Sequence, residues 1–479
     1  MPMGAERLNI VGVIFSETAV FSGKSALVEN QRALTYGDLA DAVRRVAVEL
    51  SCHGVRPLDR VAFLCPDGID YVVVTLAILS LDAAVVPIAP GLMADERRTL
   101  PERMNVRHIL MDATFQEAGK GCPLNRMKGV ERAFALTSRG HAAESLPTGY
   151  ADIRPAFIRF SSGTTGESKG VILSHETILA RTDAADAGLR VTAADTVGWV
   201  LSMSFHFVVT ILLFLRRGAT IVLCGEPMPE GLANALMRHR LTLLYASPLH
   251  YRMLAAAAGL TPLHFSFVRM AVSTAVKLPE AIARATEERF GIRLTEAYGI
   301  IEVGLPFVHC RSADEPDGTL GQPLPAYEIQ IGNDCEILIR GAGLFDAYLA
   351  PWRTRAACCP DGWFHTGDTG EWLPGGALRL SGRVKTVINF SGMKIFPQEI
   401  EDVLNAHPAI AESQAYGEPH AEYGQIPCAW LVLKPTAKPP DTTALRAFCC
   451  ERLAKHKVPK IFTVTHALKK TASGKLVRV

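Results

Sequence analysis

The sequence predicts an α/β protein with a large N-terminal domain, built from α/β subdomains and a β-rich portion, and a small α+β C-terminal domain. Three observations support this fold class. The chain has 479 residues, which is too long for one ordinary hydrophobic core. Strand-like apolar runs alternate with helical patterns along most of the chain, as in sheets covered by helices. A polar stretch with a glycine, residues 380–385, precedes a last portion of about 95 residues, the size of one small domain.

The first part of the chain gives the clearest alternation. Apolar residues at helical spacing follow residues 34–39, and residues 69–81 form a second helical pattern. Residues 60–65 and 84–88 are continuous apolar runs typical of buried strands. Residues 112–152 show little pattern, and we expect surface loops and short elements there.

The remaining elements alternate less regularly. We expect strands at 219–224 and 242–246, a helix at 278–290, and antiparallel strands at 336–340 and 377–380. In the last portion we expect helices at 397–406 and 442–453 and strands at 410–416 and 428–433, before a basic tail.

Composition narrows the class of protein. Hydrophobic residues make up 48% and charged residues 20%, which fits a globular enzyme and excludes a disordered chain. The net charge of +2 does not favour nucleic acid or an anionic membrane as the main partner. The eleven cysteines show no C-x-x-C spacing. The N-terminus does not open like a signal peptide, and the longest nearly apolar run, 207–215, is short for a membrane span. We therefore expect a soluble, cytoplasmic protein with reduced thiols and no membrane span.

One stretch carries most of the chemistry. Residues 160–170 hold five hydroxyl side chains, three glycines and Lys169, between the apolar runs 156–158 and 171–173. This order predicts a strand, a loop and a strand. Glycines allow several backbone N–H groups to point inward together, and hydroxyls and an ammonium add donors for phosphate oxygens. The Walker A spacing does not fit, because Gly170 follows the lysine.

Residues 161–170 resemble the phosphate-binding signature of the adenylate-forming superfamily, which includes acyl- and aryl-CoA synthetases, luciferases and adenylation domains. The resemblance extends from about residue 34 to residue 475, and the motifs follow in the family's order. It implies that the loop and its lysine bind the phosphates of ATP. The residues concerned are Ser161, Ser162, Gly163, Thr164, Thr165, Gly166 and Lys169.

Residues 296–302 resemble the superfamily's Tyr-Gly-x-Thr-Glu motif. The resemblance implies that Tyr298 stacks on adenine and that Glu302 helps hold Mg²⁺, a hard cation that prefers carboxylate oxygen. Ile301 stands where the family usually has Thr, so a hydroxyl expected near the α-phosphate is missing. Other residues implied at the nucleotide are Ser273, Thr274, Glu296, Ala297 and Gly299.

The last motifs concern the ribose, a hinge and the catalytic lysine. By resemblance, Asp368 and Arg383 bind the ribose end of ATP, and a carboxylate suits the two hydroxyls of a cis-diol. Lys385 matches the hinge position, Gly392 lies in a turn that lines the passage for a pantetheine thiol, and Lys475 matches the lysine that reaches the carboxylate and α-phosphate. The domains expected are 1–382, which binds ATP and the acid, and 383–479, which moves.

The pocket for the acid is inferred from the resemblance and from composition. His206 is implied at the carboxylate and could equally be a packed histidine. No carboxylate occurs in residues 204–209 to pair a substrate ammonium, so an α-amino acid is disfavoured and an apolar aryl or fatty acid is favoured. The residues implied in this pocket are Trp199, Phe205, His206, Phe207, Tyr245, Ser247, Ser273, Ile300, Gly304 and Leu305.

The resemblance implies a two-step ligase. A carboxylic acid reacts with ATP and Mg²⁺ to give an acyl-adenylate, and a thiol then displaces AMP, with His206, Lys169 and Lys475 as the catalytic residues. Coenzyme A is the expected thiol, and the phosphopantetheine of an acyl carrier protein is the alternative. A nucleotide-binding protein that has lost catalysis is a third interpretation, suggested by Ile301 and Thr274. We expect a monomer or homodimer.

Overall fold

The computed structural model describes residues 8–115, 117, 122–124, 127–139, 146–161, 169–225, 227–312, 314–391, 393–420, 422–435, 437–470 and 476–477. The chain divides into two compact units. The first comprises residues 1–315, 320–328 and 340–364, and the second comprises 316–319, 329–339 and 365–479.

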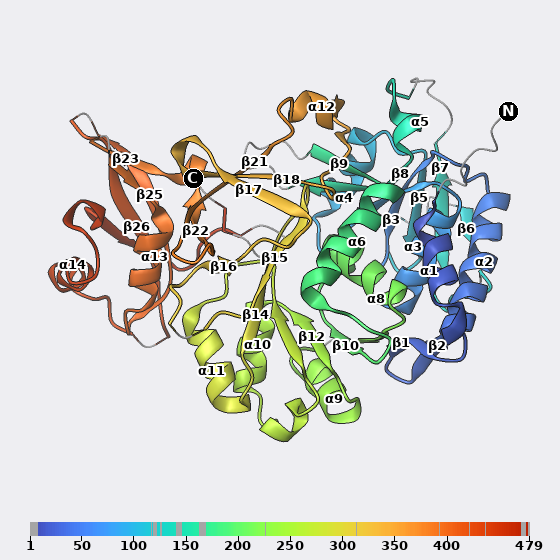
Figure 1. Ribbon diagram of the computed structural model, residues 1–479, viewed down its shortest axis with the longest axis horizontal. Helices are drawn as coiled ribbons and strands as arrows, with labels where there is room; N and C mark the ends of the chain where they lie inside the picture. Colours follow the sequence, from blue (N-terminus) through green and yellow to red (C-terminus); the bar gives the residue numbers. More distant parts are fainter. Residues whose placement is uncertain are drawn as a thin grey trace. The chain divides into compact units, whose positions relative to one another are not determined.

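A nine-stranded sheet forms one layer of the first unit (Figure 1), in the order β20-β19-β9-β8-β4-β3-β5-β7-β6. Its centre, from β8 to β5, is parallel, and its flanking strands are antiparallel. The central strands are buried on both faces, as expected for a parallel sheet between helices. The strands are β3 (Arg60–Leu64), β4 (Ala84–Ile88), β5 (His108–Asp112), β6 (Cys122–Leu124), β7 (Phe134–Ser138), β8 (Pro155–Ser161), β9 (Lys169–Ser174), β19 (Ala347–Tyr348) and β20 (Arg353–Thr354).

An eight-stranded sheet forms a second layer of the same unit, in the order β15-β14-β13-β12-β10-β11-β1-β2. The strands from β14 to β1 pair in parallel, and β15 and β2 close the two edges antiparallel. The strands are β1 (Ser25–Glu29), β2 (Arg32–Thr35), β10 (Thr196–Trp199), β11 (Thr220–Leu223), β12 (Leu243–Ala246), β13 (Met270–Ser273), β14 (Leu294–Ile300) and β15 (Gly304–His309).

Helices join the two sheets into one core. Helix α3 (Ile69–Ser80) contacts β4 and β1, and α6 (His175–Leu189) contacts β9 and β15, so each helix touches both sheets. Helix α3 is buried along its length except at its last residue, which explains why its apolar residues cover its whole circumference. Four further helices contact α3, α6 or β4. They are α1 (Ile10–Glu17), α2 (Tyr36–Cys52), α7 (Met203–His206) and α8 (Leu212–Arg216).

The other face of the eight-stranded sheet has a separate core. Helices α9 (Glu230–Arg238), α10 (Pro248–Ala256) and α11 (Glu280–Phe290) contribute Leu236, Tyr251 and Phe290 to it. Figure 1 shows these helices on the side of the sheet away from α6 and α8. Short helices α4 (Ala94–Arg103), α5 (Tyr150–Ile153) and α12 (Arg355–Cys358) complete the first unit.

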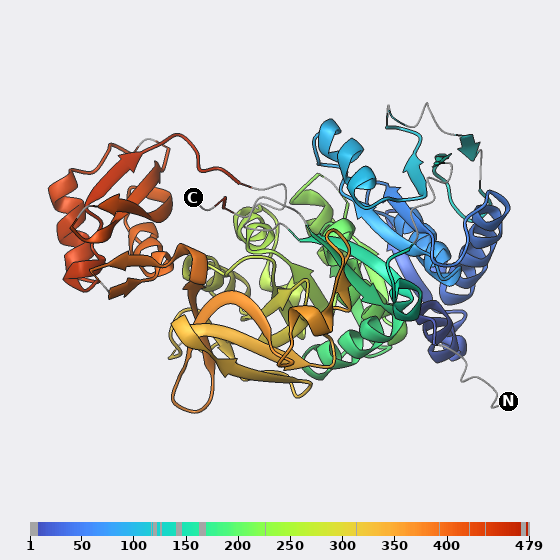
Figure 2. The same ribbon diagram turned by 90° about the horizontal axis from the view of Figure 1, so that it is seen from above.

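The second unit contains most of one sheet and the whole of another. One has the order β16-β22-β21-β18-β17, and the other has the order β24-β23-β26-β25, with β27 parallel to β26. Helices α13 (Pro397–Asn405) and α14 (Thr442–Cys450) pack on the second sheet through Ile400, Leu404 and Leu445, and Figure 2 shows these elements in orange and red. The strands are β16 (Thr319–Gly321), β17 (Tyr327–Ile331), β18 (Glu336–Gly341), β21 (Phe364–Trp372), β22 (Leu378–Arg383), β23 (Ile388–Phe390), β24 (Met393–Ile395), β25 (Ile410–His420), β26 (Gly424–Leu433) and β27 (Ile461–Val464).

These elements confirm the predicted α/β fold class. Two parts of the sheets extend beyond the strands predicted from the sequence. Strands β25 and β26 form a hairpin that extends beyond the predicted strands, because cross-strand pairing continues as far as His420 and Gly424. Strand β7, within the weakly patterned region, pairs with β5 and belongs to the sheet. The domain boundary predicted near Gly382 falls in β22, inside the second unit, and remains a prediction about how the chain moves.

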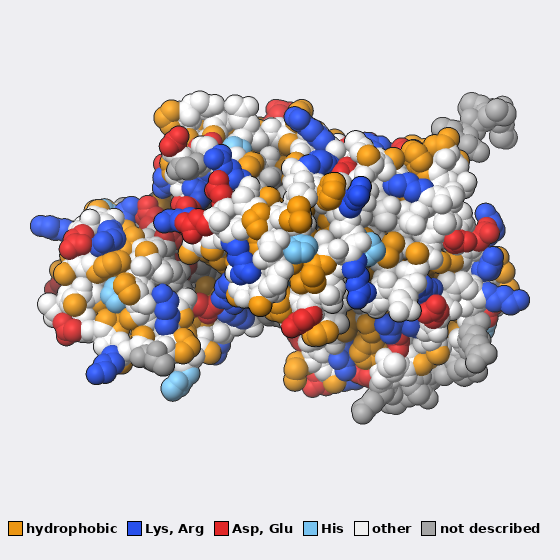
Figure 3. All heavy atoms as spheres, turned by 90° about the horizontal axis from the view of Figure 1, so that it is seen from below, with side chains coloured by type: hydrophobic (Ala, Val, Ile, Leu, Met, Phe, Trp, Pro, Cys, Tyr) orange, Lys and Arg blue, Asp and Glu red, His pale blue; other side chains and the backbone are white. Residues whose placement is uncertain are grey.

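The surface is mixed in charge. Figure 3 shows basic and acidic side chains interspersed over one face, in keeping with the net charge of +2. Within the described ranges, every helix is too short or too polar to cross a bilayer.

Candidate active site

The predicted phosphate loop joins two strongly held strands. Strands β8 and β9 pair antiparallel, and their last ladder pair is Ser161 with Lys169. Phe157 and Ile158 on β8 and Ile172 on β9 are fully buried, which fixes where the loop begins and ends. Five predicted phosphate-binding residues lie outside the described residues, namely Ser162, Gly163, Thr164, Thr165 and Gly166.

Lys169 and Glu302, predicted from separate motifs, meet around Tyr348. The Lys169 Nζ lies 5.0 Å from the centroid of the Tyr348 ring, and the Tyr348 hydroxyl donates to Glu302 Oε1 at 3.1 Å. Glu302 is 8% exposed, and burial raises the pKa of its carboxyl against the opposing effect of Arg181 and Lys169. A cation, a phenol and a buried carboxylate from three elements therefore form one cluster.

Arg181 fixes the backbone on which Glu302 lies. This arginine of α6 is 1% exposed and donates to the carbonyls of Gly343 at 2.5 Å, Ile301 at 2.8 Å and Glu302 at 2.7 Å. A Cβ at Gly343 would lie 2.9 Å from Arg181 Cγ, so only glycine permits this approach. Two segments distant in sequence are thus tied to one buried guanidinium.

The predicted adenine side is formed by neighbouring strands β13 and β14. Ser273 pairs in register with Glu296, and its buried hydroxyl has no hydrogen-bond partner among the described residues. The Thr274 hydroxyl donates to the Ala297 carbonyl at 2.9 Å, and Glu296 Oε2 accepts from Leu278 N at 3.2 Å.

Tyr298 lies next along β14. Its ring contacts Phe307 edge-to-face at 6.0 Å, and it is half-buried, whereas Gly299 is exposed. The stacking role implied for Tyr298 remains a prediction.

Several residues predicted for the acid pocket lie in the core between the sheets. Trp199 and Tyr245 are stacked at 5.5 Å, and both are 2% exposed. Phe207 is 1% exposed and packs against Tyr71 and Phe157. Contact between these rings and an acid remains a prediction.

The other predicted pocket residues differ in exposure. Leu305 and Gly304 are buried, and the latter has a φ of +105°, a conformation that favours glycine. Three of them are partly exposed: Phe205, His206 and Ile300. Ser247 precedes α10, and its hydroxyl lies 2.7 Å from His250 Nδ1.

The ribose residues implied by resemblance meet in the second unit. Asp368 on β21 and Arg383 on β22 are ladder partners, and Arg383 Nε donates to Asp368 Oδ1 at 2.5 Å. The Asp368 amide donates to the Thr366 hydroxyl at 3.0 Å, which fixes the strand where the carboxylate projects. Lys385 is exposed in a short helical turn, and Gly392 and Lys475 lie outside the described residues.

Sequence reasoning did not identify three residues of this region. Tyr348 and Arg181 act through contacts with Glu302, and no local pattern reveals such contacts. Arg159 could have been noticed, because it interrupts the apolar run that leads into the loop.

Two family descriptions match the chain. "AMP-binding enzyme" matches residues 15–349, and "AMP-binding enzyme C-terminal domain" matches residues 399–475.

Individual relatives are similar to this protein over nearly the whole chain. The 3-[(3aS,4S,7aS)-7a-methyl-1,5-dioxo-octahydro-1H-inden-4-yl]propanoyl:CoA ligase of Mycobacterium tuberculosis is 30% identical over 94% of each chain. A long-chain-fatty-acid–CoA ligase of Bacillus subtilis is 26% identical over 97% of this chain and 92% of its own. The solved o-succinylbenzoate CoA synthetase of Bacillus subtilis, in complex with an acyl-adenylate, superposes with a TM-score of 0.84 at 25% identity, over 99% of this chain and 98% of its own. The chain therefore belongs to the AMP-binding enzymes of the adenylate-forming superfamily and is an AMP-forming acid–thiol ligase.

Proposed function

We propose that this enzyme activates an apolar carboxylic acid as its acyl-adenylate and transfers the acyl group to coenzyme A. The observation that carries the proposal is the cluster of Lys169, Tyr348 and Glu302, of which Lys169 lies where the phosphate loop ends. A cation beside a buried carboxylate supports the proposal, because phosphates need positive charge and Mg²⁺ needs carboxylate oxygen. The relatives support the acid class, because their names include a bicyclic propanoyl and a long-chain fatty acid as substrates.

In the first half-reaction, a carboxylate oxygen attacks the α-phosphorus of ATP. The bond from that phosphorus to the bridging oxygen breaks, and pyrophosphate leaves. Lys169 offsets negative charge on the departing phosphates, and Lys475 offsets repulsion between the two anions. Glu302 would hold Mg²⁺, which neutralises phosphate charge when bound; a buried carboxylate beside a lysine fits this role.

In the second half-reaction, the thiol sulfur attacks the acyl carbonyl carbon. The bond from that carbon to AMP breaks, a thioester forms and the thiol proton is released. We propose that residues 383–479 rotate about Lys385 between the steps, withdraw Lys475 and admit the thiol past Gly392. Because binding holds the reactants in line, no side-chain nucleophile is required.

The acceptor is tested by supplying each thiol separately. Purified enzyme, MgATP and a panel of aryl and fatty acids are incubated with coenzyme A or with a phosphopantetheinylated carrier protein, and thioester is measured. Formation of acyl-CoA supports the proposal, whereas acylation of the carrier alone would favour the carrier-loading alternative.

Substitution of Lys475 tests the first step. Lys475→Ala should lower acid-dependent pyrophosphate release on the order of 100-fold, since about 3 kcal/mol of transition-state stabilisation is lost. It should leave ATP binding within a few fold, as measured by calorimetry. Wild-type enzyme that releases no pyrophosphate with any acid would contradict the proposed function.

A further inference from the structure

Arg159 shares one face of the nine-stranded sheet with the candidate active site. It pairs with Val171 on β9, and Val171 pairs with Tyr348 on β19. Lys169 lies two residues from Val171 on the same strand. Because directly paired residues and alternate residues project to the same side of a sheet, Arg159, Lys169 and Tyr348 project to one side.

The guanidinium of Arg159 has few acceptors among the described residues. Its Nη2 donates to the Phe205 carbonyl, and this is its one hydrogen bond within the described part of the chain. No described carboxylate lies within ion-pair distance of it. Burial, with nearby Arg181, lowers the pKa of Arg159 to about 10, so the group stays charged at neutral pH.

The half-buried guanidinium has four N–H donors without an acceptor among the described residues, and none of them is a fully buried atom, so they are open to water or to a ligand. Arg159, Arg181 and Lys169 lie around the carboxylate of Glu302, and the carboxylate of Asp346 also acts on Arg181. Arg181 is satisfied by three carbonyls. Arg159 therefore has donors available for an acceptor that arrives with a substrate.

The contact with Phe205 indicates which substrate this is. Phe205 precedes His206 on α7, the helix that carries residues implied at the acid. The contact directs the guanidinium toward that helix, whereas the nucleotide phosphates are expected at the loop and Lys169. The direction of this contact therefore favours the acid over the nucleotide as the source of acceptors.

We propose that Arg159 binds a second oxygen acceptor of the acid, a ketone or a carboxylate other than the one that reacts. The inference rests on the proposed function and refines it, from an apolar acid to an apolar acid with one additional oxygen function. The name of the Mycobacterium tuberculosis relative describes an acid of this kind, with two oxo groups on a bicyclic skeleton. Such a group would satisfy donors that the chain leaves open.

Matched pairs of acids test this assignment. The probes are 3-cyclohexylpropanoate with 3-(4-oxocyclohexyl)propanoate, and heptanoate with heptanedioate, measured by pyrophosphate release. Wild-type enzyme should prefer the oxygen-bearing member of at least one pair by about tenfold or more in kcat/KM. Arg159→Met should reduce that preference to near one and leave the KM for ATP unchanged, and Arg159→Lys should retain part of it.

The matched control is Arg217→Met, an arginine of similar partial exposure that pairs with Asp186 and lies outside the site. It should change neither the preference nor the KM for ATP. A rise in the KM for ATP with the acid preference intact would overturn the proposal and place Arg159 at the nucleotide. Absence of any preference in the wild type would also overturn it, even though pyrophosphate release would still support the proposed function.

Discussion

At the scale of single residues, the buried arginines explain how the site is held. Arg181 makes hydrogen bonds to three backbone carbonyls from segments more than 100 positions away in sequence. Each carbonyl would lose its partner if the guanidinium were removed, and a buried unsatisfied carbonyl costs about 1–3 kcal/mol. Arg181 is therefore a positioning residue for Glu302.

Arg181→Lys should weaken the binding of Mg²⁺ and lower stability by about 2–4 kcal/mol, because an ammonium lacks the planar fork that reaches three carbonyls. Pyrophosphate release titrated with Mg²⁺ should show a rise of at least several fold in the metal concentration required. Arg190→Lys, at an exposed position, is the control and should change neither quantity. An unchanged Mg²⁺ titration with lowered stability would show that Arg181 is structural only.

Contiguous motifs in the sequence predicted residues of the site, and their roles remain predictions. Residues that act through contacts across the chain were not predicted. Lys169, Glu302, Asp368 and Arg383 were named from their motifs, and the structure brings them together as two pairs, one in each unit. Tyr348 could not be assigned a role, because its contact with Glu302 spans 46 residues. Such contacts depend on which strands become neighbours.

At the scale of elements, contacts at both ends hold helix α6 in place, and the sequence predicts only some of these contacts. Ser174 caps its first turn, and Asp346 accepts hydrogen bonds from Ser174 N at 2.7 Å and from the Thr177 hydroxyl at 3.0 Å. The serine cap is a local signal. The aspartate comes from a distant segment.

His175, the first residue of α6, should make stability depend on pH. It is fully buried, its Nδ1 accepts from Ile10 N at 3.3 Å, and burial lowers its pKa from 6.5 to about 4. Between these values the unfolded chain binds a proton that the native state does not, so the free energy of unfolding falls as pH decreases from 6.5 to 4, by up to about 3 kcal/mol. Denaturant unfolding of wild type and His175→Gln at several pH values should show that the stability difference between them shrinks over this range. A difference independent of pH would contradict the prediction.

The far end of α6 depends on a glycine. A Cβ at Gly188 would lie 2.8 Å from Val308 Cβ and 3.0 Å from Leu324 Cδ2. Gly188→Ala should therefore destabilise the protein by about 1–3 kcal/mol, since neither neighbour can move freely.

Gly12 in helix α1 provides the matched control. A Cβ there would meet no atom within 4 Å, so Gly12→Ala should be neutral or stabilising by about 0.5–1 kcal/mol. Thermal unfolding of both variants makes the comparison. Equal effects of the two substitutions would contradict the packing argument for α6 and β15.

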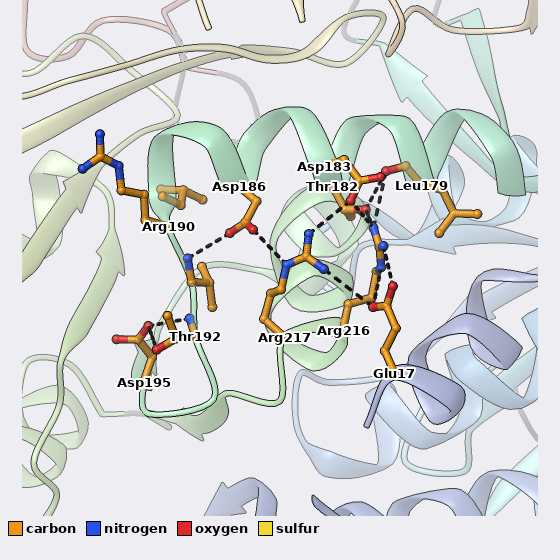
Figure 4. Close-up of polar contacts among 12 residues, drawn as sticks. Glu17, Leu179, Thr182, Asp183, Asp186, Arg190, Thr192, Asp195, Arg216 and Arg217 are labelled. Atoms are coloured by element: carbon orange, nitrogen blue, oxygen red, sulfur yellow. Dashed lines mark hydrogen bonds and ion pairs between the residues drawn. The ribbon is translucent and has the colours of Figure 1, made fainter. Parts of the chain in front are cut away.

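At the scale of the whole molecule, charged side chains also join the helices between the sheets of the first unit. Figure 4 shows Arg216 and Arg217 of the α8 region facing Glu17 at the end of α1 and Asp183 and Asp186 on α6. Arg216 is 6% exposed and lies 2.8 Å from Glu17 and 2.9 Å from Asp183, whereas the side chain of Arg217 is 28% exposed. Arg216 and Arg217 therefore share acidic partners but differ in the exposed fraction of their side chains.

Arg216→Met should destabilise the protein by about 1–3 kcal/mol, because the buried Thr182 hydroxyl and the partly exposed Glu17 and Asp183 all lose a partner, whereas Arg217→Met should cost about 1 kcal/mol or less. Equilibrium unfolding of both variants at low and high salt measures these costs. The cost at Arg217 should decrease at high salt more than the cost at Arg216. Similar costs for the two substitutions would show that burial does not determine their contributions.

The sequence by itself determined the family and the alternation of strands and helices, and it predicted the motif residues of the site. These features are local: apolar periodicity, turn chemistry and short runs of glycine, hydroxyl and charged residues suffice to state them. The tertiary structure alone decided that Tyr348 and Arg181 surround Glu302, that Arg159 faces the same side of the sheet as Lys169, and that Trp199 and Tyr245 pack against each other. These contacts follow from strand order and from the burial of charge in a low-dielectric interior, where each donor must find an acceptor wherever the fold provides one.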